Sequence, residues 1–342
     1  MFNMTILASD THENVCKFED DDTGLRCVIA VHSTKRGPAL GGTRFWTYET
    51  DDDMLKDALA LSEAMTYKNA AAELPYGGGK AVVNIKGVEK TPELLQAYAR
   101  AVSSMNGTYI TAEDVGCAPG DLEHVASFTE YCVRDCVSSS PATAFGVLQS
   151  MTAALEVFNI RRDAAYDLSH CSVVVQGAGN VGSLLAEMLV MYGAEVHVTD
   201  IKQEKVDALV AKIPSINQPA QTKKFVRIFA PCALGPAITG DNFLDMFTYD
   251  IICGAANNAV EKGLEEKLGR AGILYCPDFI ANAGGVISIH HDIVKTPREN
   301  GLGLVYAGSD VAKIHQRTRK ILLTNPGDTM KGAMDYAASN LT

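Results

Sequence analysis

The sequence predicts an α/β protein with two domains, and three observations carry this prediction. Its 342 residues exceed the usual size of one hydrophobic core, and 47% of them are apolar. In the second half, short β-branched runs alternate with helical patterns, which is typical of a doubly wound parallel sheet. A polar segment, Ser138–Pro141, interrupts the pattern and predicts a linker. We therefore expect an N-terminal α/β domain over residues 1–140 and a second domain over residues 141–326.

Composition and charge exclude several classes of protein. Asp and Glu outnumber Lys and Arg by 41 to 30, and the net charge of −11 argues against a nucleic-acid partner. No apolar run has the length of a membrane span, and residues 1–13 lack a signal-peptide pattern, so no membrane association is expected. The nine cysteines show no paired spacing, which favours reduced thiols in the cytoplasm over disulfides or a zinc site. His290, His291 and Asp292 are adjacent, but neighbouring side chains on a helix point apart, so no metal is expected.

The first half begins with a predicted strand, Leu25–His32, because the run is short, apolar and β-branched. A turn-rich segment follows at Gly37–Arg44, where backbone amides would meet a ligand. The acids Asp51–Asp53 indicate a helix N-terminus, and apolar spacing extends this helix to about Lys68.

The stretch Gly77–Lys80 is the strongest catalytic candidate in this half. Three glycines permit a turn with φ > 0 and close approach to a ligand, ahead of a strand predicted at Ala81–Ile85. A lysine held there in a partly dry place, with Lys68 nearby, would have a lowered pKa and act as a base near pH 7. The alternative, a surface lysine after a glycine turn, is equally consistent with these residues alone.

A second candidate is a carboxylate at the end of a strand. Thr91 and Pro92 cap a helix that runs to about Asn106, and Tyr109–Ala112 is a short predicted strand. Asp114 follows that strand directly. A carboxylate in this place is either a catalytic acid or the cap of the next helix.

The second half contains the clearest ligand signal. After a helix from Ala142 to about Phe158, the strand Cys171–Gln176 leads into Gly177–Gly182, which has the pattern G-x-G-x-x-G and opens a helix. The next strand ends at Asp200. The three glycines would make the tight turn, admit a pyrophosphate, and allow close packing of the helix. We expect a Rossmann-type site that takes NAD rather than NADP, because Asp200 would accept from the ribose and repel a 2′-phosphate. The alternative is a tight turn with no ligand.

Further predicted strands at Phe225–Phe229, Tyr249–Cys253 and Gly272–Tyr275 each end in a small or polar loop, and such ends line the ligand crevice of a parallel sheet. Cys232 lies in one of these loops and is expected to be a small buried hydrophobe rather than a nucleophile. A helix is expected from Val286.

Taken together, the motifs resemble the amino-acid dehydrogenase family of the glutamate, leucine, phenylalanine and valine enzymes. They occur in family order from about residue 25 to residue 290: Gly37–Arg44, Met65–Ala70, Leu74–Lys80, Thr111–Gly116, Gly177–Gly182, Ala230–Gly235, Ala255–Asn258, Pro277–Phe279 and Asn282–Gly285. The resemblance implies a Rossmann-type NAD domain, an active-site cleft between two domains, and a C-terminal helix over about 327–342 that packs back on the first domain. It also implies a homo-oligomer.

The implied reaction is the reversible oxidative deamination of an L-amino acid by NAD to a 2-oxo acid and ammonium. In the family roles, Lys68 holds the substrate carboxylate, Lys80 activates water, and Asp114 moves protons to and from the amino nitrogen. The other implied substrate residues are Leu40, Gly41, Gly42, Met65, Ala112, Asn258, Val286 and Ile289. The implied cofactor residues are Thr143, Gly177, Ala178, Gly179, Asn180, Val181, Gly182, Asp200, Ile201, Cys232, Ala233, Ala256 and Asn257.

Substrate choice follows from Leu40, which stands where glutamate members of the family have a lysine. A leucine cannot compensate a buried carboxylate, so glutamate is disfavoured and a branched aliphatic substrate such as leucine or valine is expected. Phenylalanine or another aromatic amino acid is the alternative, although the resemblance implies that phenylalanine members have more room beside the aspartate than Ala112 leaves here. A nucleotide-binding homologue without catalysis is a remote alternative, and the presence of both Lys80 and Asp114 argues against it.

Overall fold

The computed structural model describes the chain except for residues 119, 135–138, 219–222, 234, 295–301 and 342. The chain divides into two compact units. Unit 1 groups Met1–Val137 with Asp292–Thr296 and Ala337–Thr342, and unit 2 groups Ser138–His291 with Pro297–Tyr336. Within the part of the chain that is described, no helix is long and apolar enough to cross a membrane.

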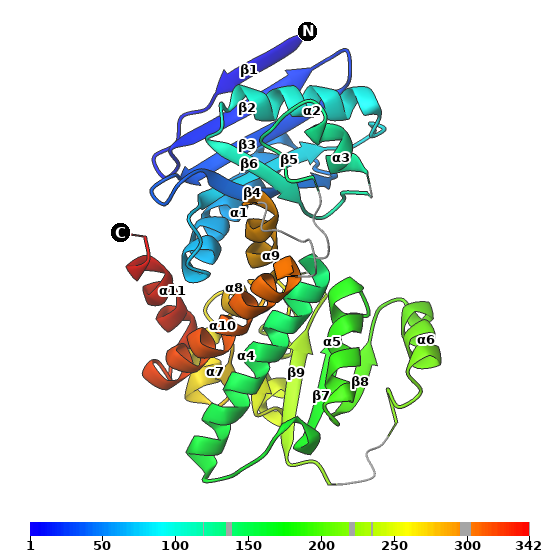
Figure 1. Ribbon diagram of the computed structural model, residues 1–342, viewed down its shortest axis with the longest axis vertical. Helices are drawn as coiled ribbons and strands as arrows, with labels where there is room; N and C mark the ends of the chain where they lie inside the picture. The colour runs from blue at the N-terminus through cyan, green and yellow to red at the C-terminus, as the bar shows by residue number, and fades with distance from the viewer. Residues whose placement is uncertain (119, 135–138, 219–222, 234, 295–301, 342) are drawn as a thin grey trace. The chain divides into compact units, whose positions relative to one another are not determined.

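The described residues of unit 1 form a mixed six-stranded sheet in the order β1-β2-β3-β5-β4-β6 (Figure 1). Strands β1 to β3 and β5 pair antiparallel, whereas β4 is parallel to both of its neighbours. Because β4 lies between β5 and β6 and is parallel to both, the carboxyl ends of these three strands point the same way. The strands are β1 (Phe2–Ile6), β2 (Asn14–Asp20), β3 (Leu25–Ser33), β4 (Ala39–Trp46), β5 (Gly77–Asn84) and β6 (Tyr109–Glu113).

Each face of this sheet is covered by helix. One face packs under α2 (Pro92–Ser104) through Leu94 and Tyr98, and α3 (Asp121–Ala126) lies beside α2. The other face packs under α1 (Asp51–Ala71) through Met54 and Ala58. Because side chains alternate along a strand, β2, β3 and β5 contribute to both cores. Helix α1 begins at Asp51, as predicted from the three acids. The side chain of Thr50 caps it by accepting a hydrogen bond from the amide of Asp53.

The prediction of a glycine turn ahead of Lys80 is wrong. Gly77, Gly78, Gly79 and Lys80 all belong to β5, and the three glycines do not have positive φ. A Cβ on Gly78 would lie 2.1 Å from the amide nitrogen of Thr66 in α1. Glycine is therefore required here for close packing of a helix on a strand, which a local turn signal does not distinguish.

The turn-rich segment expected at Gly37–Arg44 is also corrected. Gly37 has φ of +135°, but Ala39 already begins β4, which continues past Arg44. The glycines of β4 again meet neighbouring backbone, since a Cβ on Gly41 would lie 1.8 Å from the carbonyl oxygen of Gly79.

Unit 2 contains a parallel five-stranded sheet in the order β11-β10-β9-β7-β8, as expected for a doubly wound fold. Its strands are β7 (Cys171–Gln176), β8 (Glu195–Thr199), β9 (Val226–Pro231), β10 (Ile251–Ile252) and β11 (Leu274–Tyr275). Its helical segments are α4 (Ser139–Arg162), η1 (Leu168–His170), α5 (Asn180–Met191), α6 (Gln203–Lys212), η2 (Phe243–Thr248), α7 (Glu265–Arg270), α8 (Asp278–Ala281), α9 (Gly284–Ile293), α10 (Leu302–Thr324) and α11 (Thr329–Ser339).

The segment read as a linker is helical where it is described. Ser139, Ser140 and Pro141 form the first turn of α4, because Pro is tolerated there, and Ser138 lies outside the described residues. The helix expected from Val286 begins two residues earlier, at Gly284, whose missing Cβ would lie 1.9 Å from the carbonyl oxygen of Ala142. Strands β1 and β2 were not predicted.

At the C-terminus, the last residues of α11 are grouped with unit 1, where the guanidinium of Arg36 donates to the carbonyl of Asn340. The divisions predicted at residues 140 and 326 stay predictions.

Candidate active site

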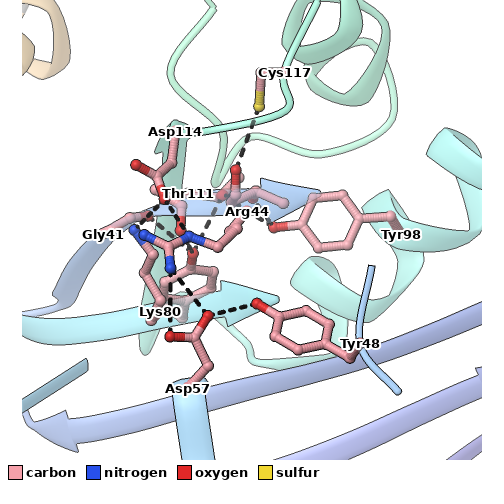
Figure 2. Close-up of polar contacts among 12 residues, drawn as sticks. Gly41, Arg44, Tyr48, Asp57, Lys80, Tyr98, Thr111, Asp114 and Cys117 are labelled. Carbon is pink, nitrogen blue, oxygen red and sulfur yellow. Dashed lines mark hydrogen bonds and ion pairs between the residues drawn. The ribbon is translucent and has the colours of Figure 1, made fainter. Parts of the chain in front are cut away.

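Lys80 and Asp114 form a buried ion pair in unit 1. Lys80 lies in β5 and Asp114 follows β6 directly, on the two strands that flank β4. Lys80 Nζ is 2.7 Å from Asp114 Oδ2, and the two side chains are 6% and 21% exposed (Figure 2). The sheet therefore brings together the two residues predicted to be catalytic, a cation and a carboxylate in direct contact.

Asp114 is held in its ionised form by its neighbours. Burial opposes ionisation of this carboxyl, but Lys80 and then Arg44 outweigh it, so the pKa of Asp114 lies below its usual value. Glu113, one residue before, shows the opposite effect: burial and then the charge of Asp114 raise its pKa. Two adjacent carboxylates thus differ in protonation behaviour because only Asp114 faces the two cations.

Glycines make the close approach of these strands possible. A Cβ on Gly42 would lie 2.7 Å from Cβ of Asp114, and a Cβ on Gly79 would lie 2.7 Å from the ring of Tyr109. The hydroxyl of Tyr109 donates to the carbonyl of Gly41 at 2.8 Å. The carboxylate of Asp114 is consequently packed against β4 without an intervening side chain.

Arg44 is part of this network, although the sequence analysis assigned it no role. Its Nε is 3.3 Å from Asp114 Oδ2, and its Nη1 is 3.0 Å from Asp57 Oδ2 in α1. The hydroxyl of Tyr48 donates to the same Asp57 oxygen (Figure 2). The sequence feature that could have revealed this role is a charged side chain in a glycine-rich strand, because a buried charge requires partners.

The other substrate residues expected in the first half also lie in unit 1. Leu40 and Ala112 are 1% exposed, whereas Met65 and Lys68 on α1 are partly exposed. A Cβ on Gly41 would lie 3.4 Å from Met65 Cγ, so α1 lies against β4 at this point. α1 is fixed there because Asn69, one residue beyond Lys68, donates to the carbonyls of Leu40 and Gly77 at 3.1 and 2.7 Å.

In unit 2, the loop Gly177–Gly182 has the geometry of a dinucleotide site. Gly177 has φ of +111°, as the tight turn requires, and a Cβ on Gly182 would lie 1.9 Å from the carbonyl oxygen of Gly177. A Cβ on Gly179 would meet no atom within 4 Å. Open space at the N-terminus of α5, which begins with Asn180 and Val181, is what a pyrophosphate needs.

Asp200 connects the end of β8 to this loop. Its Oδ2 accepts from the amide of Ala178 at 2.8 Å, and its Oδ1 accepts from the amide of Lys202 at 2.9 Å. These two backbone hydrogen bonds, first that of Lys202 and then that of Ala178, lower the pKa of Asp200. The ionised carboxylate therefore lies beside the glycine-rich loop, and the next residue, Ile201, is fully exposed.

The loops after β9 and β10 complete this side of unit 2. The backbone of Cys232 and the amide of Ala233 lie against Gly177, and the amide of Ala256 donates to the carbonyl of Pro231. Cys232 itself is half-buried, and this burial raises the pKa of its thiol to about 11, so the thiol is neutral near pH 7.

Asn282 lies in one of the sequence motifs, but no individual role was predicted for it. Its amide donates to the carbonyl of Ala255 at 3.1 Å and to Oδ1 of Asn257 at 2.8 Å, and thereby orders the loop in which Asn257 and Asn258 are exposed. Asn258 has φ of +51°, which asparagine tolerates better than most residues.

The remaining expected residues, Thr143, Val286 and Ile289, are carried by α4 and α9 of unit 2. Thr143 Oγ1 lies 2.9 Å from where a Cβ on Gly285 would be, so α4 and the start of α9 are in contact. Among the described residues, no group of three or more His, Cys, Asp or Glu side chains is arranged to hold a metal ion.

Unit 2 has a parallel sheet with a glycine-rich βα loop, and unit 1 has a lysine–carboxylate ion pair. This combination is typical of a dehydrogenase built from two units. Comparison with known proteins specifies the class. Residues 12–131 match the model of the Glu/Leu/Phe/Val dehydrogenase dimerisation domain, and residues 197–299 match that of Glutamate/Leucine/Phenylalanine/Valine dehydrogenase.

Individual relatives agree with these matches. The chain is 42% identical to a valine dehydrogenase of Streptomyces virginiae over 84% of each chain. It is 36% identical to a leucine dehydrogenase of Bacillus subtilis, over 85% of this chain and 81% of that enzyme. The crystal structure of L-tryptophan dehydrogenase from Nostoc punctiforme superposes with a TM-score of 0.76 at 33% identity, covering 97% of this chain and 96% of the other.

The chain belongs to the glutamate/leucine/phenylalanine/valine dehydrogenase family. It is therefore an amino-acid dehydrogenase, an oxidoreductase that uses a nicotinamide cofactor.

Proposed function

We propose that this protein catalyses the NAD-dependent oxidative deamination of branched aliphatic L-amino acids, with leucine and valine as the leading substrates. The observation that carries the proposal is the contact of 2.7 Å between Lys80 Nζ and Asp114 Oδ2. The reaction converts an amino acid, water and NAD into a 2-oxo acid, ammonium, NADH and a proton, so it needs one group that activates water and another that moves protons at nitrogen.

The protein's own residues divide this work. Lys68 would bind the substrate carboxylate by charge, and Asp114 would accept a proton from the substrate ammonium before oxidation. The bound NAD would take the hydride from Cα. Lys80 would then remove a proton from the water that attacks the resulting iminium carbon, and Asp114 would return a proton to the departing nitrogen. The pairing of Lys80 with Asp114 allows the two proton transfers to be coordinated.

The cofactor would be held by the loop Gly177–Gly182, with its pyrophosphate at the N-terminus of α5. Asp200 supports NAD over NADP, because its ionised carboxylate would repel a 2′-phosphate on the ribose. Thr143 and Asn257 would bind the nicotinamide side. We propose that the domain divisions lie near residues 140 and 326, and that the enzyme is a cytoplasmic homo-oligomer.

The choice of substrate is based on Leu40. An apolar side chain at this position cannot pair with a substrate carboxylate, and leaving one buried and unpaired costs several kcal/mol. Val286 and Ile289 would add aliphatic surface from α9. Aromatic amino acids are the second candidate, because a tryptophan dehydrogenase is among the similar structures and Ala112 is small.

The test is NADH formation with L-leucine, L-valine, L-phenylalanine, L-tryptophan and L-glutamate at mildly alkaline pH, repeated with NADP. We expect leucine and valine to exceed the aromatic substrates in kcat/KM, and glutamate to be inactive. The variant Leu40→Lys is expected to weaken leucine and valine by at least tenfold. Preference for an aromatic substrate would select the second candidate, and no activity with any of the five would refute the proposal.

A further inference from the structure

Arg44 joins the predicted catalytic carboxylate to a second acid. Its Nε is 3.3 Å from Asp114 Oδ2, while its Nη1 contacts both oxygens of Asp57, at 3.0 and 3.3 Å. The hydroxyl of Tyr48 donates to Asp57 (Figure 2). Lys80, Asp114, Arg44 and Asp57 thus form a row of alternating charge, and Tyr48 ends it.

The two cations contact the same oxygen of Asp114, but they differ chemically. An ammonium group exchanges its proton, whereas a guanidinium stays charged in proteins. In the proposed reaction Lys80 becomes neutral before it removes a proton from water. A buried carboxylate whose cation partner becomes neutral tends to take up a proton itself. Arg44 supplies a charge at Asp114 Oδ2 that does not depend on the state of Lys80.

We propose that Arg44 is a positioning residue that holds Asp114 by Oδ2 and keeps it ionised until it accepts the substrate's proton, and that Asp57 and Tyr48 hold Arg44 in place. The inference rests on the proposed function for its catalytic consequence, but the contact itself does not. The geometry suits arginine specifically, because a planar fork with several donors reaches two carboxylates at once.

The other titratable groups facing Asp114 do not replace this charge. Lys80 on β5 changes its protonation state in the proposed reaction. Glu113 on β6 is itself a carboxyl, and its pKa is raised by burial and then by the charge of Asp114. Burial raises the pKa of the Cys117 thiol to about 12, so this group is neutral near pH 7. Among the described residues that contact Asp114, Arg44 is thus the cation that persists.

The experiment uses the full chain with three substitutions. Arg44→Gln removes the charge, Arg44→Lys keeps the charge without the fork, and Tyr48→Phe changes no charge and loses one hydrogen bond to Asp57. The measurements are the pH dependence of kcat/KM with leucine, and the titration of the Asp114 carboxyl by ¹³C NMR after labelling of aspartate. The Asp114 signal is identified by its absence in Asp114→Asn.

In Arg44→Gln we expect the carboxyl titration and the acidic limb of the pH profile to move upward together, by roughly 1–3 pH units. We expect kcat to fall on the order of 10²-fold, the cost of a misplaced catalytic group. Arg44→Lys should show a smaller upward shift, and Tyr48→Phe the smallest.

Titrations of Asp114 in Arg44→Gln and Arg44→Lys that coincide with the wild type, in folded protein, would overturn the inference. If Arg44→Gln does not fold, the same comparison in Arg44→Lys and Tyr48→Phe decides the matter. The two proposals can also fail separately. If the wild type oxidises no amino acid but the Asp114 titration shifts in Arg44→Gln, the proposed function is refuted and the role of Arg44 is supported.

Discussion

Gly179 and Gly182 belong to one loop, yet the structure predicts that substitution by alanine affects them in opposite ways. At Gly179, φ is −83° and an added Cβ meets nothing within 4 Å, so Gly179→Ala is compatible with the fold. Because this residue is the N-cap of α5, where alanine is poorer than glycine, we expect a loss of up to about 1 kcal/mol in the free energy of unfolding. The methyl group would occupy the space proposed here for the pyrophosphate, so NADH affinity should fall at least tenfold, about 1.4 kcal/mol.

At Gly182, the added Cβ would lie 1.9 Å from the carbonyl oxygen of Gly177, against 3.4 Å where ordinary contact begins. Overpacking against fixed backbone costs about 1–3 kcal/mol or more, so Gly182→Ala should unfold at a lower temperature even without cofactor. The assays are thermal unfolding of the cofactor-free protein and fluorescence titration with NADH. Unchanged NADH affinity in Gly179→Ala, or an unchanged unfolding temperature in Gly182→Ala, would refute the assignment of the two glycines.

Three further substitutions test other parts of the molecule. Lys80→Ala should lower kcat by about 10²–10⁴-fold and leave NADH binding within twofold, whereas Lys86→Ala, which removes a surface lysine just after the same strand, should change neither. Asp200→Ala should weaken NADH binding, because the amides of Ala178 and Lys202 lose their acceptor. It should also narrow the preference for NAD over NADP, measured as a ratio of kcat/KM values, because the charge that would repel a 2′-phosphate is removed. Burial, and then a neighbouring imidazole, lower the pKa of His32 in the folded protein, so stability should fall as the pH drops through the unfolded value of 6.5. The free energy of unfolding, measured with urea at pH 7 and pH 5, should therefore differ less between the two pH values in His32→Gln than in the wild type. His197→Gln in unit 2 is the matched control.

Each of these expectations has a clear contrary outcome. Normal turnover of Lys80→Ala would remove this residue from the mechanism. An unchanged cofactor ratio in Asp200→Ala would mean that another residue reads the ribose. Equal pH dependence of unfolding in the wild type and His32→Gln would place the acid sensitivity elsewhere.

Local patterns were sufficient to predict the parallel sheet and the glycine-rich loop of unit 2. The strand Cys171–Gln176, the glycine loop and the acid at Asp200 are close in sequence, and each glycine in the loop has a role that follows from its position. The parallel order also follows from the alternation of β-branched and helical runs, which is a property of neighbouring segments.

Unit 1 was harder to predict because its key contacts are not local. The side chains of Lys80 and Asp114 meet because β4 lies between β5 and β6, an order that the sequence does not state. The glycines before Lys80 were interpreted as a turn, since glycine is the usual turn residue, whereas the helix packed on them requires their small size. The contact of Arg44 with Asp57 likewise depends on how α1 lies on the sheet, so no spacing rule reveals it.

The glycines of β4 and β5 also limit how this enzyme's specificity can be engineered or diversified. A methyl group on Gly41, Gly42 or Gly78 would collide with backbone, so substitution at these positions alters the whole sheet rather than the shape of a pocket. New substrate preferences would therefore be sought at side chains that already exist, such as the proposed substrate residues Leu40 and Met65. A combinatorial library confined to such positions would retain a far larger fraction of folded members than one that randomises the motif as a block.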